Sequence, residues 1–341
     1  MSFKRLDPQD FLISADSVVG GMFSGDVTTL TTFFTSSTQA GTEYYRDVSD
    51  LLVTNESSEV QFAVAYGSKF GSGSAQFDSN IKGFSPSSAV YGQAQNIIIG
   101  DENNNFTFGG VTPPEQSIYV LSFERARFKG NIFPGTLALK LTKGANSITL
   151  TDNSKDVAVD TFNEAGRVYE LVSGSNGSAA TTTSTNQVAN GMTISGSYGL
   201  VLPDVGIIIL NGEALDLAAG AGGIILGTGT SNNANDDNNK KLIDAIIAGA
   251  SFKAQSQENV TSDFVFVRAR NGEFNYSENP SFISGSTGEV IHNEFINAPQ
   301  TFISSIGLYN DNNELLAVAK LSKPLKKDFT KEALIRVKLD F

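Results

Sequence analysis

The sequence predicts a mainly β protein, built as one or two antiparallel sandwich-like modules with one short helix and an extended N-terminal arm. Three observations predict this fold class. Charged residues make up only 18% of the 341 residues, glycine is abundant at 33 residues, and several segments alternate apolar and polar residues over short stretches. This composition favours strands and turns over helices, and a chain of this length can bury a sizeable core.

Residues 1–45 are expected to form the arm. They include DVTTLTTFFTSSTQ, a Thr-rich run with good β propensity but no regular alternation. The pattern becomes regular in EVQFAVAYG, residues 59–67, where larger apolar side chains occupy every second position as in a strand with one packed face. Residues 89–100 and 104–110 are two further candidate segments.

The middle of the chain continues with strands. The stretch from Gln116 to Phe128 reads as a strand, and residues 143–146 are expected to connect a hairpin whose strands carry Leu139 and Ile148. The Gly/Ser/Thr-rich run that follows is predicted to be an exposed excursion, because it cannot bury enough apolar surface to order itself. Pro203 indicates an edge or a bend.

The one helix is predicted at Asn239 to Ala248. Asp236 or Asp237 can cap its start, and Gly249 is placed to end it. Its apolar face is formed by Leu242, Ile243, Ile246 and Ile247. For the domains we expect the arm at 1–45, a β-rich core from 46–170 and 261–341, and an inserted loop and strand region with the helix at 171–260.

The C-terminal segment predicts a second hairpin and a terminal strand. Two apolar runs flank Asn310 to Asn313, residues that tolerate left-handed backbone and form Asx turns. Pro324 is expected to end the second strand of this hairpin. The last segment then alternates from Ile335 to Phe341, which directs one apolar face inward to the end of the sequence.

Two Arg-Ala-Arg segments follow aromatic or apolar residues, at 125–127 and at 268–270. A duplicated unit would place them equivalently, but no further register match supports a repeat. We interpret both as edge strands with outward arginines.

The sequence contains no complete catalytic, dinucleotide-binding or calcium-binding motif, because each candidate lacks a residue that the chemistry needs. Cysteine is absent, His292 is the only histidine, and no G-x-S-x-G elbow occurs. The run at 220–225 lacks the third glycine of a dinucleotide fingerprint, and the loop at Asp101 lacks the glycine and glutamate of a calcium loop. We therefore predict no catalytic residue, cofactor or metal. Paired carboxylates keep glycoside hydrolysis open, although tryptophan is absent.

Charge is uneven along the chain. The net charge of −12 and pI near 4.6 predict no binding to nucleic acid or membranes, and no secretory signal or membrane-spanning run is recognised, so a soluble protein made in the cytoplasm is expected. Residues 320–341 carry seven basic and three acidic side chains, a local charge of +4 that leaves −16 elsewhere. This basic end either guides contacts between subunits or forms an ordinary solvated face.

Candidate interface residues come from two places in the sequence. Phe33, Phe34, Tyr44 and Tyr45 are the aromatic candidates, with an ordinary core role as the alternative. Lys326 and Lys327 represent the basic segment.

A resemblance adds a function. FKRLDPQDF near the start, FVFVRARNGEFNYSENPSF, and the block from IGLYNDNNELLAVAKL to the end resemble a virion structural protein of contractile-tailed phages that infect marine bacteria, including cyanobacteria. Residues 174–190 match less well. The resemblance implies a non-enzymatic subunit of the tail baseplate, assembled in the host cytoplasm into the virion tail as a homo- or hetero-oligomer with other virion proteins. A neck or collar protein, a glycan-binding fibre-type module and a surface-polysaccharide hydrolase are the alternatives.

Overall fold

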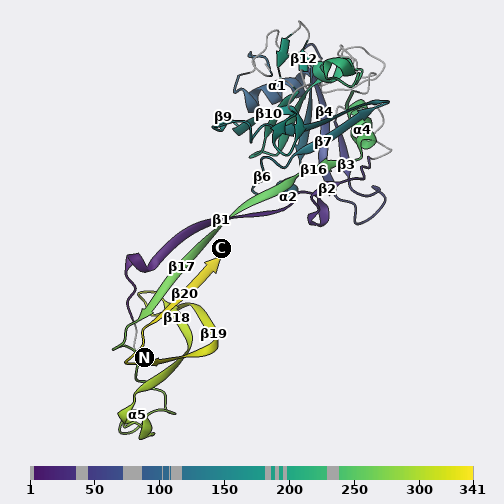
Figure 1. Cartoon of the computed structure of the whole chain (residues 1–341). Coiled ribbons are helices and arrows are strands. Elements are labelled where there is room, and N and C mark those ends of the chain that lie inside the picture. The colour runs from purple at the N-terminus through teal and green to yellow at the C-terminus, as the bar shows by residue number, and fades with distance from the viewer. Residues whose placement is uncertain are drawn as a thin grey trace. The chain divides into compact units, whose positions relative to one another are not determined.

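In the computed structural model the chain forms two compact units (Figure 1). Unit 1 comprises Met1–Ser17 and Asn259–Phe341, and unit 2 comprises Val18–Glu258. Both boundaries fall inside strands, namely β1 (Phe11–Gly21) and β17 (Gln255–Ala269). The structure describes residues 4–35, 45–71, 87–101, 103–106, 108, 117–180, 186–188, 192–194, 198–228 and 238–340.

Unit 2 is built around an antiparallel sheet with 12 strands among the described residues. Its main path runs β2-β16-β7-β8-β10-β14-β15-β5-β4-β3, and β9 and β11 pair with β10. The strands are β2 (Thr29–Leu30), β3 (Tyr45–Ser49), β4 (Val60–Ser68), β5 (Ser117–Phe123), β7 (Ala138–Lys143), β8 (Asn146–Asp152), β9 (Thr161–Asn163), β10 (Gly166–Ser175), β11 (Ser178–Ala179), β14 (Gly199–Leu202), β15 (Ile207–Asn211) and β16 (Phe252–Lys253). Outside this sheet, β12 (Asn186–Val188) pairs with β13 (Met192–Ile194), and β6 (Asn131–Ile132) pairs with β17.

The large sheet curls until its two ends meet. Phe34, which follows β2, exchanges two backbone hydrogen bonds of 2.9 and 2.8 Å with Ser49 at the end of β3. Inside the curl, the ring of Phe252 on β16 lies 5.5 Å from that of Phe62 on β4. Strands from opposite ends of the path therefore share one core, and the closure protects backbone groups that an open sheet would leave unpaired.

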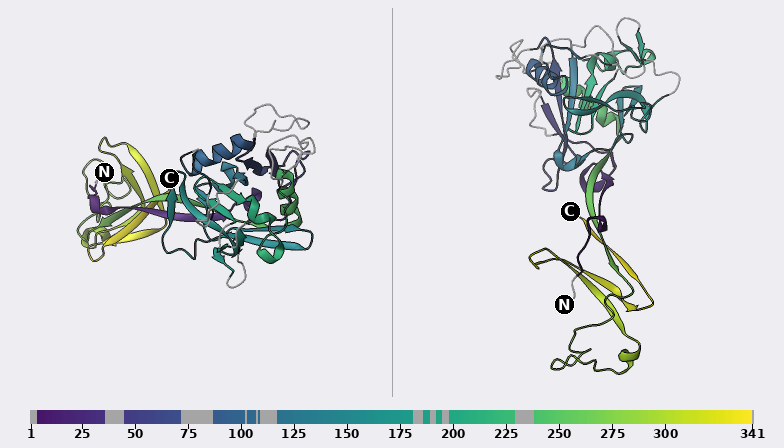
Figure 2. Two further views of the ribbon diagram at one scale, coloured as in Figure 1. Left: turned by 90° about the horizontal axis from the view of Figure 1, so that it is seen from above. Right: turned by 90° about the vertical axis from the view of Figure 1, so that its left-hand side faces the viewer.

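Two cores lie on the two faces of this sheet because side chains alternate along each strand. On β5, Tyr119 and Leu121 enter the core inside the curl, while Ile118 enters the second core. Helix α4 (Asn238–Gly249) packs into the first core, and α1 (Ser87–Ile98) covers the second, so the two helices lie on different sides of the strands (Figure 2). The remaining helices are the short α2 (Arg125–Phe128), α3 (Gly212–Asp216) and α5 (Glu294–Asn297), with 3-10 turns at Pro8–Asp10, Ser24–Asp26 and Ala219–Ala221.

Among its described residues, unit 1 contains two small sheets. In the first, β17 lies between β1 and β20 (Ala333–Asp340), with Val265 directly opposite Val337. In the second, β18 (Gln300–Tyr309) pairs only with β19 (Leu315–Asp328) to form a long hairpin. Figure 1 shows this hairpin in the yellow-green part of the chain.

The predicted fold class is confirmed: the protein is mainly β, with antiparallel sheets and the predicted short helix. The first predicted hairpin is β7–β8, with Leu139 opposite Leu150 and the turn glycine Gly144 at φ 59°. The second is β18–β19, where the Asn310 carboxamide oxygen accepts bonds from the backbone N–H groups of Asn312 and Glu314. Asn313 has the left-handed φ of 62° that this turn requires.

The prediction that Pro324 ends its strand is wrong, because β19 continues to Asp328. Ser305 pairs with Lys320 whereas Ile303 pairs with Leu325, so the register shifts and Pro324 falls inside a β-bulge. A bulged residue donates no ladder hydrogen bond, and a proline is therefore accommodated there without loss.

The interpretation of both Arg-Ala-Arg segments as edge strands is also wrong. The first forms helix α2, after β5, and β5 pairs with both β4 and β15. The second lies at the end of β17, the middle strand of its sheet. Local sequence similarity does not fix the structure here, since strand position depends on partners distant in the sequence.

The candidate segment at residues 89–100 belongs largely to helix α1, which buries Tyr91, Ala94 and Ile98 along one face. The division into units also differs from the expected domain ranges. Residues 46–170 and 261–341, expected to share a core, fall into unit 2 and unit 1 respectively. Both ranges are strand-rich, and composition alone does not indicate which strands pair.

Candidate functional site

Unit 1 buries very few of its apolar side chains. Among its described residues the buried hydrophobic ones are Val265, Ala269, Ala333 and Val337. They lie opposite one another on β17 and β20, in the pairs Val265 with Val337 and Ala269 with Ala333. Two valines and two alanines form a small core for a unit of this length, since a domain of about 100 residues normally buries most of its apolar surface.

The same unit exposes many large apolar side chains. They occur on β1, along the hairpin, beyond it, and in the loop between β17 and β18. The residues are Phe11, Leu12, Ile13, Tyr276, Ile291, Ile296, Phe302, Tyr309, Leu315, Leu316, Val318, Leu325, Phe329 and Leu334. Single exposed hydrophobic residues are common on soluble proteins, but a concentration of them on one unit marks an interaction site. We call the six on β18 and β19 (Phe302, Tyr309, Leu315, Leu316, Val318 and Leu325) the hairpin surface.

The hairpin surface results from the sequence of β19. LLAVAKL, residues 315–321, is almost continuously apolar, so side chains on both faces of the strand are hydrophobic. Leu316 and Val318 are 68% and 62% exposed, while Ala317 and Ala319 on the opposite face are half-buried. A two-stranded hairpin by itself is marginally stable in water, so this one needs a covering surface.

A buried lysine anchors the base of the hairpin. The Lys327 side chain is fully buried, and its ammonium donates to the backbone oxygens of Asn271 and Asp328 at 3.0 Å each. A third bond of 2.8 Å goes to Oδ1 of Asn275, which is itself buried. All three donors of the ammonium have an oxygen acceptor, which satisfies the charge without a paired carboxylate.

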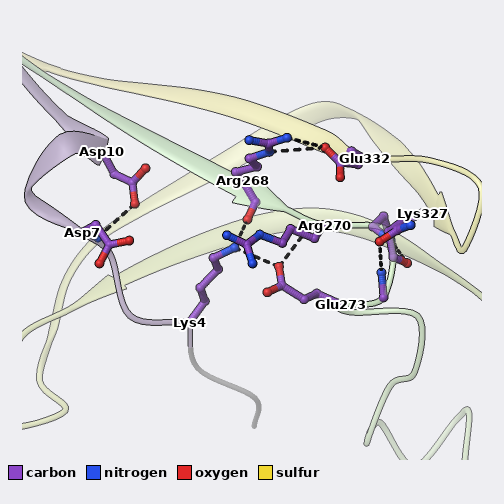
Figure 3. Close-up of polar contacts among 10 residues, drawn as sticks. Lys4, Asp7, Asp10, Arg268, Arg270, Glu273, Lys327 and Glu332 are labelled. Carbon is purple, nitrogen blue, oxygen red and sulfur yellow. Dashed lines mark hydrogen bonds and ion pairs between the residues drawn. The ribbon is translucent and has the colours of Figure 1, made fainter.

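Ion pairs connect the N-terminal segment and β20 to the end of β17 (Figure 3). The Lys4 ammonium lies 2.8 Å from Glu273 Oε2 and also donates to the backbone oxygen of Arg268. The hydrogen bond from Lys4, followed by that from the Arg270 backbone, lowers the pKa of Glu273. Arg268 in turn pairs with Glu332 at 2.7 Å, and this hydrogen bond lowers the pKa of Glu332.

In unit 2, an ion pair with shifted pKa values joins a strand to a neighbouring turn. Arg167 Nη2 on β10 lies 2.6 Å from Oδ1 of Asp204 in the β14–β15 turn, and further bonds from its Nε and backbone N–H reach the same carboxylate. Burial acts to raise the pKa of Asp204, but the bonds and the charge of Arg167 outweigh burial. The pKa of Asp204 is therefore below its ordinary value. Burial also raises the pKa of Tyr198, whose hydroxyl donates to Gly222, to about 12. These groups are bonded within the fold.

The three segments compared with catalytic, calcium and dinucleotide motifs make contacts within the fold. His292 lies in a loop, with its ring 6.0 Å from that of Phe295. The Asp101 carboxylate accepts bonds from Asn103 and Asn104. Within the 220–225 run, Gly223 is packed so tightly that a Cβ on it would lie 2.0 Å from the Leu217 oxygen. Within the described ranges, no group of three His, Cys, Asp or Glu side chains is arranged to hold a metal ion.

The predicted interface residues are not brought together. Phe33 is buried in the core of unit 2, Phe34 forms the bridge that closes the sheet, and Tyr45 is 39% exposed on β3. Tyr44 lies outside the described residues. In unit 1, Lys326 is exposed and lies 3.9 Å from Asp328, whereas Lys327 is buried. The prediction of surface anchors therefore stays open for Tyr45 and Lys326.

Sequence reasoning missed the hairpin surface. The hairpin itself was predicted, but the exposure of its apolar side chains was not. The signal that could have revealed the surface is the apolar run at 315–321, because a strand with one solvated face alternates and this one does not.

Comparison of the chain with models of protein families, with curated proteins and with solved structures finds no match. In the described part of the chain, none of the helices has the length and apolar character needed to cross a membrane.

Proposed function

We propose that the chain is a non-enzymatic structural subunit of a phage virion, located in the tail baseplate, where it joins neighbouring subunits. The observation that carries the joining role is the apolar surface of unit 1, with 14 exposed large hydrophobic residues against four buried ones among its described residues. Burial of such a surface against neighbours stabilises both the unit and the assembly. The location in the virion tail rests on the sequence resemblance.

The two units suit different tasks in this proposal. Unit 2 has a closed sheet with two cores and folds around its own apolar residues. Unit 1 leaves its apolar residues at the surface. A subunit that has one self-sufficient unit and one that needs partners contributes rigid shape and attachment together.

Labelled antibody against the chain, applied to intact contractile-tailed particles that carry this sequence and viewed by electron microscopy, tests the location. Signal confined to the tail tip is expected. Signal at the head–tail junction would move the protein to the neck or collar. Absence of signal on particles whose known tail proteins are labelled in parallel would overturn the virion proposal.

A second candidate function is a host-surface glycan-binding module. The observation that favours it is an aromatic cluster in the loop between β17 and β18, where Tyr276 contacts Phe282 at 5.8 Å between ring centroids and Phe282 contacts Phe295 at 5.3 Å. Tyr276 is half exposed, and exposed aromatic rings stack on sugars. Binding of the intact chain to host surface polysaccharide, lost in Tyr276→Ala and kept in Tyr45→Ala, would support this function over a purely structural one.

A further inference from the structure

Among the described residues of unit 1, no further strand extends the sheet of β18 and β19. This hairpin forms a sheet of its own among the described residues, and β17 and β20 pair with each other and not with it. Its exposed side chains include an aromatic residue near each end, Phe302 and Tyr309, with Leu316 and Val318 on the second strand. The length and apolar character of this hairpin require a partner that buries it.

The size of the hairpin surface fits a protein partner. Six large side chains that are 39% to 68% exposed present about 600 Å² of apolar area, compared with about 800 Å² of total area per partner in an interface of standard size. The polar residues around these six would supply the remainder as the rim.

The distribution of charged residues in unit 1 indicates which protein can cover the hairpin surface. Residues 274–299, which precede the hairpin, contain Glu278, Glu289 and Glu294 and no lysine or arginine. Residues 320–340 contain seven basic and three acidic residues. Among the described residues, Glu289 and Glu294 form no ion pair, and neither do Lys320 and Lys323. Unit 1 therefore exposes two acidic residues in this loop and two lysines on β19 that are available for contacts with another molecule.

Both halves of this complementary pair are present on every copy of the chain. In a two-fold arrangement the acidic loop of one copy meets the basic strand of the other, and the reverse contact forms at the same time. Unit 1 as a whole has 11 basic and 13 acidic residues, a net charge of −2, so two copies of it repel each other little.

We infer that the hairpin surface is covered by a second copy of this chain, through an isologous contact in which the 274–299 loop of each copy faces the basic part of β19 in the other. This inference rests on the proposed function, because it names the first neighbour that the subunit joins. The apolar residues supply the burial, and the loop-to-strand charges set the register.

Sedimentation equilibrium of the intact chain tests the contact. Wild type is expected to form a dimer, and Leu316→Lys with Val318→Lys is expected to raise the dissociation constant at least about 100-fold, because it places two charges in a desolvated interface. Both positions are exposed in the single chain, so the substitutions do not disturb its core. The matched control is Val159→Lys with Phe162→Lys, an apolar pair in unit 2 that is also exposed, and this control is expected to leave the dimer unchanged.

A charge exchange tests the register. Lys320→Glu with Lys323→Glu makes loop and strand both acidic, and Glu289→Lys with Glu294→Lys makes both basic, so each variant alone is expected to be monomeric. An equimolar mixture restores both contacts in one heterodimer and is expected to dimerise at low salt, with the affinity falling as salt is added.

A mixture that stays monomeric would overturn the proposed register and with it the isologous contact. Wild type that is monomeric up to about 100 µM, where an interface of this size is expected to form, would show that a different protein covers the hairpin. That result would leave the baseplate proposal standing, since antibody localisation tests it separately.

Discussion

At the scale of single residues, Lys327 shows how a charge is held inside unit 1. Lysine is rarely buried unless its ammonium finds partners, and this one meets three oxygens that belong to Asn271, Asn275 and Asp328. Its sequence neighbour Lys326 points to solvent, because successive side chains of a strand lie on opposite faces. The sequence predicted a basic segment here, but it could not tell which lysine was structural.

Replacement of Lys327 by Met removes the three bonds. The backbone oxygens of Asn271 and Asp328 keep the bonds they accept from the Asn275 carboxamide and the Lys331 N–H, whereas the buried Asn275 Oδ1 loses its lysine donor. We expect the stability of unit 1 to fall by about 1–3 kcal/mol, the cost of leaving buried polar groups unsatisfied. Urea denaturation of the intact chain, followed by hydrogen exchange in β19, measures the loss. Lys326→Met is the matched control and should change stability by less than about 0.5 kcal/mol; equal effects of the two changes would contradict the anchoring role.

At the scale of elements, glycines reveal how closely the helices of unit 2 approach the sheet. Gly249 ends α4 where the helix meets β7, and a Cβ there would lie 1.9 Å from the backbone oxygen of Lys140. Gly92 lies inside α1 with nothing within 4 Å of the position a Cβ would take. The sequence places Gly249 correctly as a helix stop, but only the packed structure shows that the residue is also needed for contact.

The two glycines should therefore respond to alanine in opposite directions. Gly249→Ala is expected to destabilise unit 2 by about 1–3 kcal/mol through overpacking against β7. Gly92→Ala is expected to stabilise it by about 0.5–1 kcal/mol, because alanine loses less conformational freedom in a helix interior. Chemical denaturation monitored by far-ultraviolet circular dichroism compares the two variants with wild type. A loss of stability in both would mean that α1 packs more tightly than the structure shows.

At the scale of the whole molecule, the two units differ in how they are stabilised. Unit 2 closes its sheet through the Phe34–Ser49 bridge and fills both faces with apolar side chains. Unit 1 relies on ion pairs at its surface, on the Lys327 anchor and on two small β sheets. Exposed ion pairs contribute little to stability, so unit 1 should open far more readily than unit 2 when it has no partner.

Hydrogen exchange of the intact chain at low concentration can compare two hairpins in the same molecule. Amides of β18–β19 should exchange at least about 100-fold faster than those of β7–β8, because β7–β8 lies within the large sheet and β18–β19 forms a sheet of its own. Mass spectrometry of peptides from the two hairpins gives the comparison directly. Similar protection in a verified monomer would show that the β18–β19 hairpin is stable without cover.

Local patterns in the sequence determined the turns, the helix α4 and the strand-rich character of this protein. Residues such as Asn310, Gly144 and Leu242 act through their own backbone preferences or through neighbours a few positions away. Their effect can therefore be predicted from the local sequence.

Tertiary structure alone decided the pairing of distant strands and the use of each surface. It placed Pro324 in a bulge and made β17 a central strand. It also buried Phe33 while leaving Leu316 exposed. The physical reason is that strand pairing and burial depend on which distant segments come together, and hydrophobicity measures only the tendency of a side chain to leave water, not the surface it will meet.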